Sequence, residues 1–330
     1  MKKCSQCGAV FPDNYTFCPG CGIKAPEYPT TGGRIACVAK GVLFVILFMV
    51  VQFAASFVYT IYATIAVMSS GNLSVIDDPQ ALTNAVLEMV ERNTSALSIA
   101  IYVITVLAIL IIFAAKKRKF TESVGINSFG YGAIPFAVLV GIALNYFVVC
   151  AMAITPVPQS WIDRYDEIYS FMGEGNVVLE FVSVAILAPI VEEIVFRGLC
   201  YRYARKGFRP IVAALISGVV FGIAHGNAIS FVYTTLLGVV LAYAYEKSGS
   251  IIPSILIHIG FNAGSYLVDV TLPDDDIQLW MILVILAASA ALSALFCALL
   301  FKFSKKTVPE PRPDENFTIN VDPPSTDSQF

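Results

Sequence analysis

The sequence predicts an all-α polytopic membrane protein of about eight transmembrane helices, preceded by a small cysteine-rich module. Three observations predict this fold class. Of the 330 residues, 57% are hydrophobic and 14% are charged, whereas a soluble domain has about 45–50% apolar and about 25% charged residues. Apolar segments long enough to cross about 30 Å of hydrocarbon recur along the chain. Four cysteines lie before residue 22, well separated from these segments.

Eight segments have the length and composition of a membrane span. We place them at roughly 36–68, 96–115, 130–154, 177–205, 210–227, 228–246, 250–270 and 278–301. The fifth and sixth segments are divided only by the turn-forming sequence His225-Gly226-Asn227, because no Asp, Glu, Lys or Arg occurs from Pro210 to Tyr245. The count of eight therefore depends on that division.

Lys and Arg residues gather after every second predicted span, which indicates the cytoplasmic side. They are Lys116, Lys117, Arg118, Lys119, Arg202, Arg205, Lys206, Arg209, Lys247, Lys302, Lys305 and Lys306. Both termini are then cytoplasmic. The tail at 302–330 is polar and rich in proline, and we expect it to be disordered. A net charge of -3 offers no basic excess, so nucleic acid is not an expected partner.

Residues 1–26 contain two pairs of cysteines with the C-x-x-C spacing. The pairs are Cys4-Ser-Gln-Cys7 and Cys18-Pro-Gly-Cys21. Two such pairs place four thiolates around one structural Zn²⁺, and a disulfide pair is the alternative in an oxidising compartment. Because the four ligands fill the coordination sphere, the module is expected to be structural or to bind a cytoplasmic protein. It resembles the zinc ribbons of many prokaryotic membrane proteins, which implies a prokaryotic cytoplasmic membrane. Residues 27–35 are the expected linker to the first span.

Three charged residues lie inside the fourth predicted span, at Glu192, Glu193 and Arg197. Each charge costs about 2.5–3.5 kcal/mol on insertion scales, so such residues are functional by default. Glu193 and Arg197 are four residues apart on a helix, the spacing of a side-chain ion pair. Glu192 is left without that partner and is the better candidate for a reactive carboxylate.

Both histidines of the chain, His225 and His258, lie in apolar spans. Phe221 precedes His225 by four residues and can shield its imidazole, while Asn262 follows His258 by four and can face the same point. The alternative is that both histidines are structural residues of the core whose ring nitrogens are hydrogen-bonded. Glu192 and His225 lie at similar distances from the predicted hairpin between them, so they can be level. His258 is near the start of its span, and needs a displaced boundary, a tilt or a kink to meet them.

Three motifs thus follow one another on successive apolar helices: Glu192-Glu193-x-x-x-Arg197, Phe221-x-x-x-His225 and His258-x-x-x-Asn262. In this order they resemble the motifs of the CPBP family, the CAAX proteases and bacteriocin-processing enzymes (Abi family). These are multi-pass intramembrane proteases related to the type II CAAX prenyl endopeptidase. The resemblance covers about residues 120–301, which leaves residues 36–119 as an additional N-terminal pair of spans.

The resemblance implies hydrolysis of a peptide bond in a membrane-embedded or lipidated substrate. Glu192 would be the general base, with His225 holding the water, and His258 and Asn262 would stabilise the oxyanion. Glu193 would pair with Arg197 to orient Glu192, or share in the site. The same histidines with Glu192 are also a plausible catalytic Zn²⁺ ligand set, so metal dependence stays open. The alternative is a non-catalytic transporter, proton relay or bacteriocin-immunity scaffold that uses the same buried polar groups.

Overall fold

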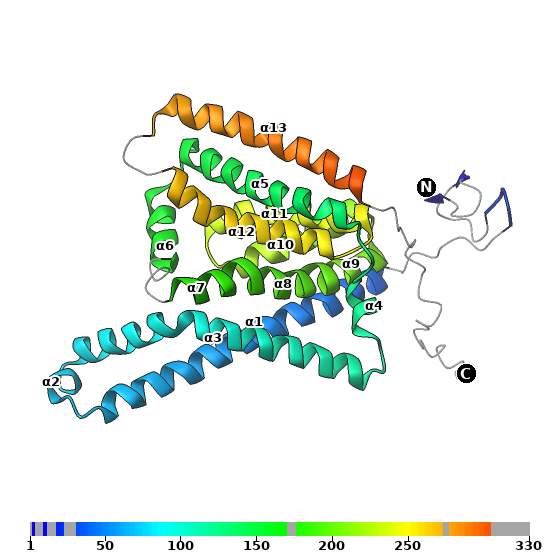
Figure 1. Cartoon of the computed structure of the whole chain (residues 1–330). Coiled ribbons are helices and arrows are strands. Elements are labelled where there is room, and N and C mark those ends of the chain that lie inside the picture. Colours follow the sequence, from blue (N-terminus) through cyan, green and yellow to red (C-terminus); the bar gives the residue numbers. More distant parts are fainter. Residues whose placement is uncertain are drawn as a thin grey trace, which may run out of the picture.

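The computed structural model describes residues 2–3, 9–11, 18–22, 31–169, 176–272 and 277–304. Two short strands, β1 (Lys2–Lys3) and β2 (Val10–Phe11), pair antiparallel near the N-terminus. The rest of the described regular structure is helical (Figure 1). Cys4, Cys7 and the tail from residue 305 lie outside the described residues, and so do the predictions made for them.

The helical elements follow one another from Thr31 to Phe303, with 3₁₀ geometry in η1 and π geometry in η2 and η3. They are α1 (Thr31–Ser69), α2 (Leu73–Ile76), α3 (Pro79–Ala115), α4 (Phe120–Val124), η1 (Tyr131–Ala133), α5 (Ile134–Ile154), α6 (Gln159–Tyr169), α7 (Val177–Glu180), η2 (Phe181–Leu187), α8 (Ala188–Glu193), η3 (Ile194–Tyr201), α9 (Arg202–Gly207), α10 (Pro210–Ala224), α11 (Ala228–Ser248), α12 (Ile252–Thr271) and α13 (Leu279–Phe303).

Five of the described helices are long and apolar enough to cross a membrane. They are α1, α3, η1 with α5, α11 and α13. These helices support an integral membrane protein, but not the predicted count of eight spans. The span expected at 177–205 is divided into alternating α and π segments, and the one at 210–227 is the 15-residue α10. Helix α12 has 20 residues, but His258, Asn262 and Asp269 make it less apolar than a typical span. These three exceptions carry all the candidate catalytic residues.

Helices α1 and α3 form a long antiparallel hairpin that is inclined to the other helices (Figure 1). They contain 39 and 37 residues, and at about 1.5 Å per residue each is nearly twice as long as the hydrocarbon layer is thick. Helix α1 begins at Thr31, inside the range assigned to the linker. Helix α3 begins at Pro79, before the predicted 96, because Asp78 caps it by accepting from the Gln80 amide at 2.9 Å.

Small residues bring the helices around the site into close contact. Helix α5 packs between α12 and α13 (Figure 1), and a Cβ atom on Gly260 would clash with the carbonyl of Val138 on α5. Gly218 and Gly222 of α10 face the backbone of α11 in the same way. Small residues at a four-residue spacing allow such a close approach between helices. Gly226 instead forms the turn between α10 and α11, with φ of 75°.

The turn between α11 and α12 is buried, which explains how His258 reaches the site. Ser250 and Ile251 are fully buried. The segment between α4 and α5 covers them: the Ile251 amide donates to Gly125 O at 3.0 Å, and the Asn127 amide donates to Gly249 O at 2.6 Å. Helix α12 therefore begins beneath the protein surface. Helix α12 starts at Ile252, close to the predicted start of this span at 250, so the boundary is not displaced, and His258 reaches the site because the start of the helix is itself buried.

Candidate active site

A buried ion pair forms the base of the site. Arg197 Nη1 donates to Glu193 Oε1 at 2.6 Å, and both side chains are fully buried. The guanidinium also lies over the ring of Phe221, 4.4 Å from its centroid, a cation–π contact that the sequence did not indicate. The predicted four-residue pair between Glu193 and Arg197 is therefore present in the structure, and helix α10 holds its basic member in place.

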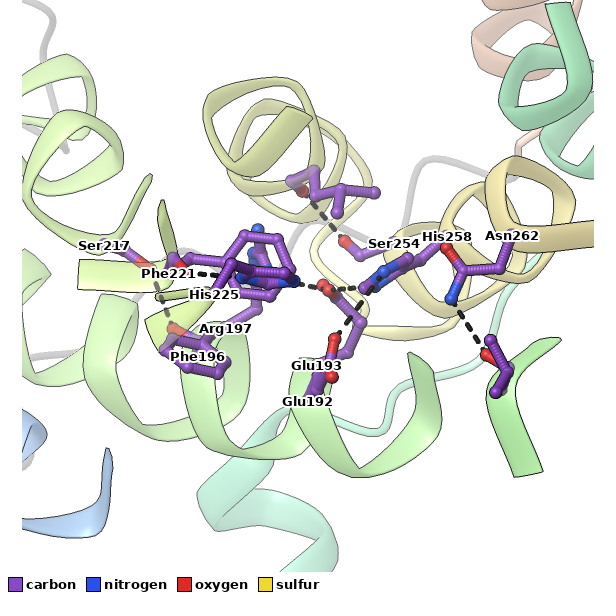
Figure 2. Close-up of polar contacts among 12 residues, drawn as sticks. Glu192, Glu193, Phe196, Arg197, Ser217, Phe221, His225, Ser254, His258 and Asn262 are labelled. Carbon is purple, nitrogen blue, oxygen red and sulfur yellow. Dashed lines mark hydrogen bonds and ion pairs between the residues drawn. The ribbon is translucent and has the colours of Figure 1, made fainter. Parts of the chain in front are cut away.

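His258 connects this ion pair to Glu192 (Figure 2). Its Nδ1 atom is 3.0 Å from Glu193 Oε1, and its Nε2 atom is 3.7 Å from Glu192 Oε2. The carboxylate of Glu193 is bonded to Arg197 and acts as a hydrogen-bond acceptor. Nδ1 of His258 therefore carries a proton and donates a hydrogen bond to Glu193. Nε2 then faces Glu192 across a distance that one bridging water can span. Glu192 keeps 17% of its side chain exposed, so it can be reached from outside.

His225 occupies the C-cap position of α10 rather than the interior of a span. Its Nδ1 atom is 2.8 Å from the carbonyl of Phe221. Since a carbonyl only accepts, this nitrogen carries the proton and leaves Nε2 of the neutral ring as an acceptor. The Phe221 ring contacts both imidazoles edge to face, with centroid separations of 4.7 Å to His225 and 5.6 Å to His258. Phe221 therefore lies against His225 as its spacing predicts.

Asn262 fills a gap in the backbone hydrogen bonds of η2. Within η2 the Ala188 amide donates to the carbonyl of Ser183, five residues back. The same spacing would pair Val184 O with the amide of residue 189, but Pro189 has no N–H. Nδ2 of Asn262 donates to Val184 O instead, at 2.9 Å. The amide has a second N–H, so this structural bond leaves one donor for another partner.

The residues of the site, as they are placed, do not fit a metal ion. Each imidazole donates Nδ1–H to an oxygen, as metal-bound histidines do. However, the described part of the chain contains no group of three His, Cys, Asp or Glu side chains arranged to hold a metal. We therefore derive no step through a catalytic Zn²⁺.

The second cysteine pair of the N-terminal module lies partly within the described residues. Cys18 is buried and its sulfur accepts from the Gly20 amide at 3.3 Å, while Gly22 has φ of 72°. This turn agrees with the geometry expected of a C-x-x-C knuckle. Since Cys4 and Cys7 are not described, the zinc ribbon stays a prediction.

The hydrogen bond between Glu193 and His258 is the feature that the sequence did not reveal. Glu193 was expected to pair with Arg197, and His258 to act with Asn262. The two residues are 65 positions apart, and no local spacing reports a contact between different helices. The sequence contains one indication of this contact. Placing His258 in the membrane in addition to Glu193 and Arg197 is costly, and a hydrogen-bond network shared by the three residues lowers that cost.

Residues 174–264 match the family model of the "Type II CAAX prenyl endopeptidase Rce1-like" proteins. This match confirms the resemblance to the CPBP family. The matched segment contains Glu192, His225, His258 and Asn262, so the CPBP-like part of the chain holds the whole candidate site.

A curated relative of the chain is the "Putative membrane peptidase YdiL" of Bacillus subtilis (strain 168). It is 31% identical over 86 residues, which are 26% of this chain and 35% of the relative. The chain thus matches about a third of the relative's length. No solved structure matches the chain.

Proposed function

We propose that this protein is an intramembrane endopeptidase that hydrolyses a peptide bond of a membrane-associated or lipidated substrate. One observation carries the proposal: His258 reaches Glu192 and Glu193 from a helix 65 residues further along the chain. A core that needed only packing would not gather two carboxylates, a guanidinium and an imidazole, three of them buried, because charge is costly there. The CPBP resemblance supports peptide hydrolysis as the chemistry.

Glu192 is the proposed general base. It is the more exposed of the two carboxylates, and it is not the partner of Arg197. A water molecule between Glu192 and His258 Nε2 gives up one proton to the carboxylate as its oxygen attacks the carbonyl carbon of the substrate. When the carbon–nitrogen bond breaks, protonated Glu192 returns that proton to the departing amine.

The imidazoles and Asn262 act on the water and on the developing oxyanion. Nε2 of His225 accepts a hydrogen bond from the water, because Nδ1 is held by the Phe221 carbonyl. His258 keeps Nδ1–H on Glu193; donation from its Nε2 to the oxyanion requires the imidazolium form, and the second N–H of Asn262 donates to the same oxygen. Glu193 and Arg197 are positioning residues, because they fix the orientation of His258.

The substrate class rests on the resemblance and on the position of the site among apolar helices. The matched family model describes type II CAAX prenyl endopeptidase Rce1-like proteins. The relative is named a putative membrane peptidase. We propose a substrate whose scissile bond reaches membrane depth, either in a transmembrane segment or beside a lipid anchor. We also propose that both termini face the cytoplasm and that the N-terminal cysteines bind structural zinc.

A comparison of membrane proteomes tests the function and searches for the substrate. Cells that express the wild-type protein are compared with cells that express Glu192→Gln, and new peptide N-termini are mapped by mass spectrometry. We expect fragments of membrane or lipidated proteins only with the wild type. Identical sets of N-termini in both strains would contradict an endopeptidase in those cells.

A further inference from the structure

Helix α6 lies across the ends of the longer helices instead of running along them (Figure 1). It follows α5, precedes α7 and contacts α11. Its residues lie before the segment at 174–264 that matches the family model. No helix was predicted between the spans at 130–154 and 177–205, so the helical structure of this stretch is a new feature.

The side chains of α6 divide into an apolar side and a charged side. At about 100° per residue, one side of the helix presents Trp161, Ile162, Tyr165 and Ile168. The opposite side presents Asp163, Arg164, Asp166 and Glu167. The apolar side is only partly covered by protein: Ile162 and Ile168 are half-buried, and Trp161 is 42% exposed. In water, an exposed tryptophan on a helix of this pattern would be unfavourable.

The chain segments on either side of α6 also expose apolar residues. Ile154 at the end of α5 is 39% exposed, and the first turn of α7 exposes Val177 and Val178. The other tryptophan of the chain, Trp280, begins α13 at the same end of the helices and is 60% exposed (Figure 1). Tryptophans gather where lipid headgroups meet hydrocarbon. Both tryptophans of this chain lie at one end of the helices, which agrees with a membrane boundary at that end.

We propose that α6 is an interfacial helix, which lies in the plane of the membrane at one boundary between headgroups and hydrocarbon. Its apolar side inserts among lipids beside α5 and α7, and its charged side faces water. The partner is the bilayer surface, because α6 lies across one end of the membrane-spanning helices (Figure 1) and keeps Trp161 exposed there. With three acids and one arginine, α6 is held by apolar insertion and not by attraction to anionic lipids.

Two tryptophans allow the depth of α6 to be measured directly. In the variant Trp280→Phe, Trp161 is the only tryptophan, and the full chain is reconstituted into phosphatidylcholine vesicles. Lipids brominated near the headgroup or near the chain end then quench its fluorescence according to depth, and aqueous iodide reports exposure to water. We expect a blue-shifted emission and a larger loss of fluorescence with the headgroup-proximal bromine than with the deep bromine or iodide.

The variant Trp161→Phe is the matched control, in which Trp280 reports the depth of the start of α13. Strong quenching by iodide with no effect of either brominated lipid would place α6 in water. Stronger quenching by the deep bromine would place it in the hydrocarbon. Protection from all three quenchers would place Trp161 in a contact with another protein chain. Each of these three results overturns the proposal.

Discussion

His258 Nδ1 lies 3.0 Å from Glu193 Oε1, the same oxygen that accepts from Arg197 at 2.6 Å. One carboxylate oxygen therefore holds two cationic or potentially cationic groups, which come from η3 and α12. The second oxygen of Glu193 is buried and has no hydrogen-bond partner among the described residues. Glu193 thus holds Arg197 and His258 in place, and Glu192 is the carboxylate that can bind a water molecule.

The variant Glu193→Leu should lose stability and activity together. It leaves the Arg197 charge buried without a partner, which costs about 3–5 kcal/mol, and it removes the acceptor that orients His258. Adding Arg197→Met removes the second buried charge, so the double variant should regain most of the stability. The hydrolysis rate should stay low in both. Thermal unfolding in detergent and a cleavage assay give the two quantities, and a fully stable Glu193→Leu would contradict the buried pair.

Gly260→Ala should separate α12 from α5. The added methyl group would meet the backbone of Val138, which cannot move aside as a flexible side chain can. Overpacking of this kind costs about 1–3 kcal/mol, and the melting temperature in detergent should fall. Gly132→Ala is the matched control, since a Cβ there has nothing within 4 Å. Equal melting temperatures for the two variants would show that the close packing is not as described.

Asn262 should have a structural and a catalytic contribution that can be separated. Asn262→Ala leaves the Val184 carbonyl without its donor, which costs about 1–3 kcal/mol, and it should lower kcat about 10²-fold or more if the amide also donates to the oxyanion. Adding Pro189→Ala restores a backbone N–H opposite Val184. We expect this second change to recover stability and not kcat. Recovery of both would assign Asn262 a structural role only.

The purified chain should contain zinc in a one-to-one ratio if the N-terminal cysteines form a ribbon. Loss of one thiolate from a four-thiolate site weakens binding strongly, so Cys18→Ser should abolish the zinc signal measured by mass spectrometry of the metal. The control Cys297→Ser changes a cysteine of α13 and should leave it intact. A reduced wild-type chain without zinc would contradict the ribbon.

Much of the site could be predicted from the sequence because intramembrane charges and histidines are rare. The spacing of Glu193 and Arg197 gave a pair within one helix, and the spacing of Phe221 and His225 gave a second. The contact between Glu193 and His258 could not be predicted, since it depends on how α12 is placed against the other helices. Long-range hydrogen bonds to Gly125 and Asn127 hold the start of α12 in the buried position from which His258 reaches the site.

The described helices do not support the predicted count of eight spans for a related reason. The prediction treated each long apolar segment as one helix that crosses the membrane. The segments that carry the polar residues of the site are instead shortened or interrupted. Pro189 and the π geometry of η2 divide the fourth segment, and the turn at Gly226 ends α10 after 15 residues. Helix α6 was missed because it is too short and too polar to be recognised as a membrane span, and its apolar side is apparent only when positions are counted at the helical period.

Cleavage by the purified protein tests the central claim most directly. The wild type, Glu192→Gln and Glu167→Gln are reconstituted in vesicles with a transmembrane peptide or a prenylated peptide, and products are identified by mass spectrometry. Glu167→Gln makes the same chemical change on the exposed surface of α6. We predict cleavage by the wild type and by Glu167→Gln, and a rate lower by about 10²–10⁴-fold in Glu192→Gln. Equal cleavage by all three proteins would contradict the assignment of Glu192 as the general base.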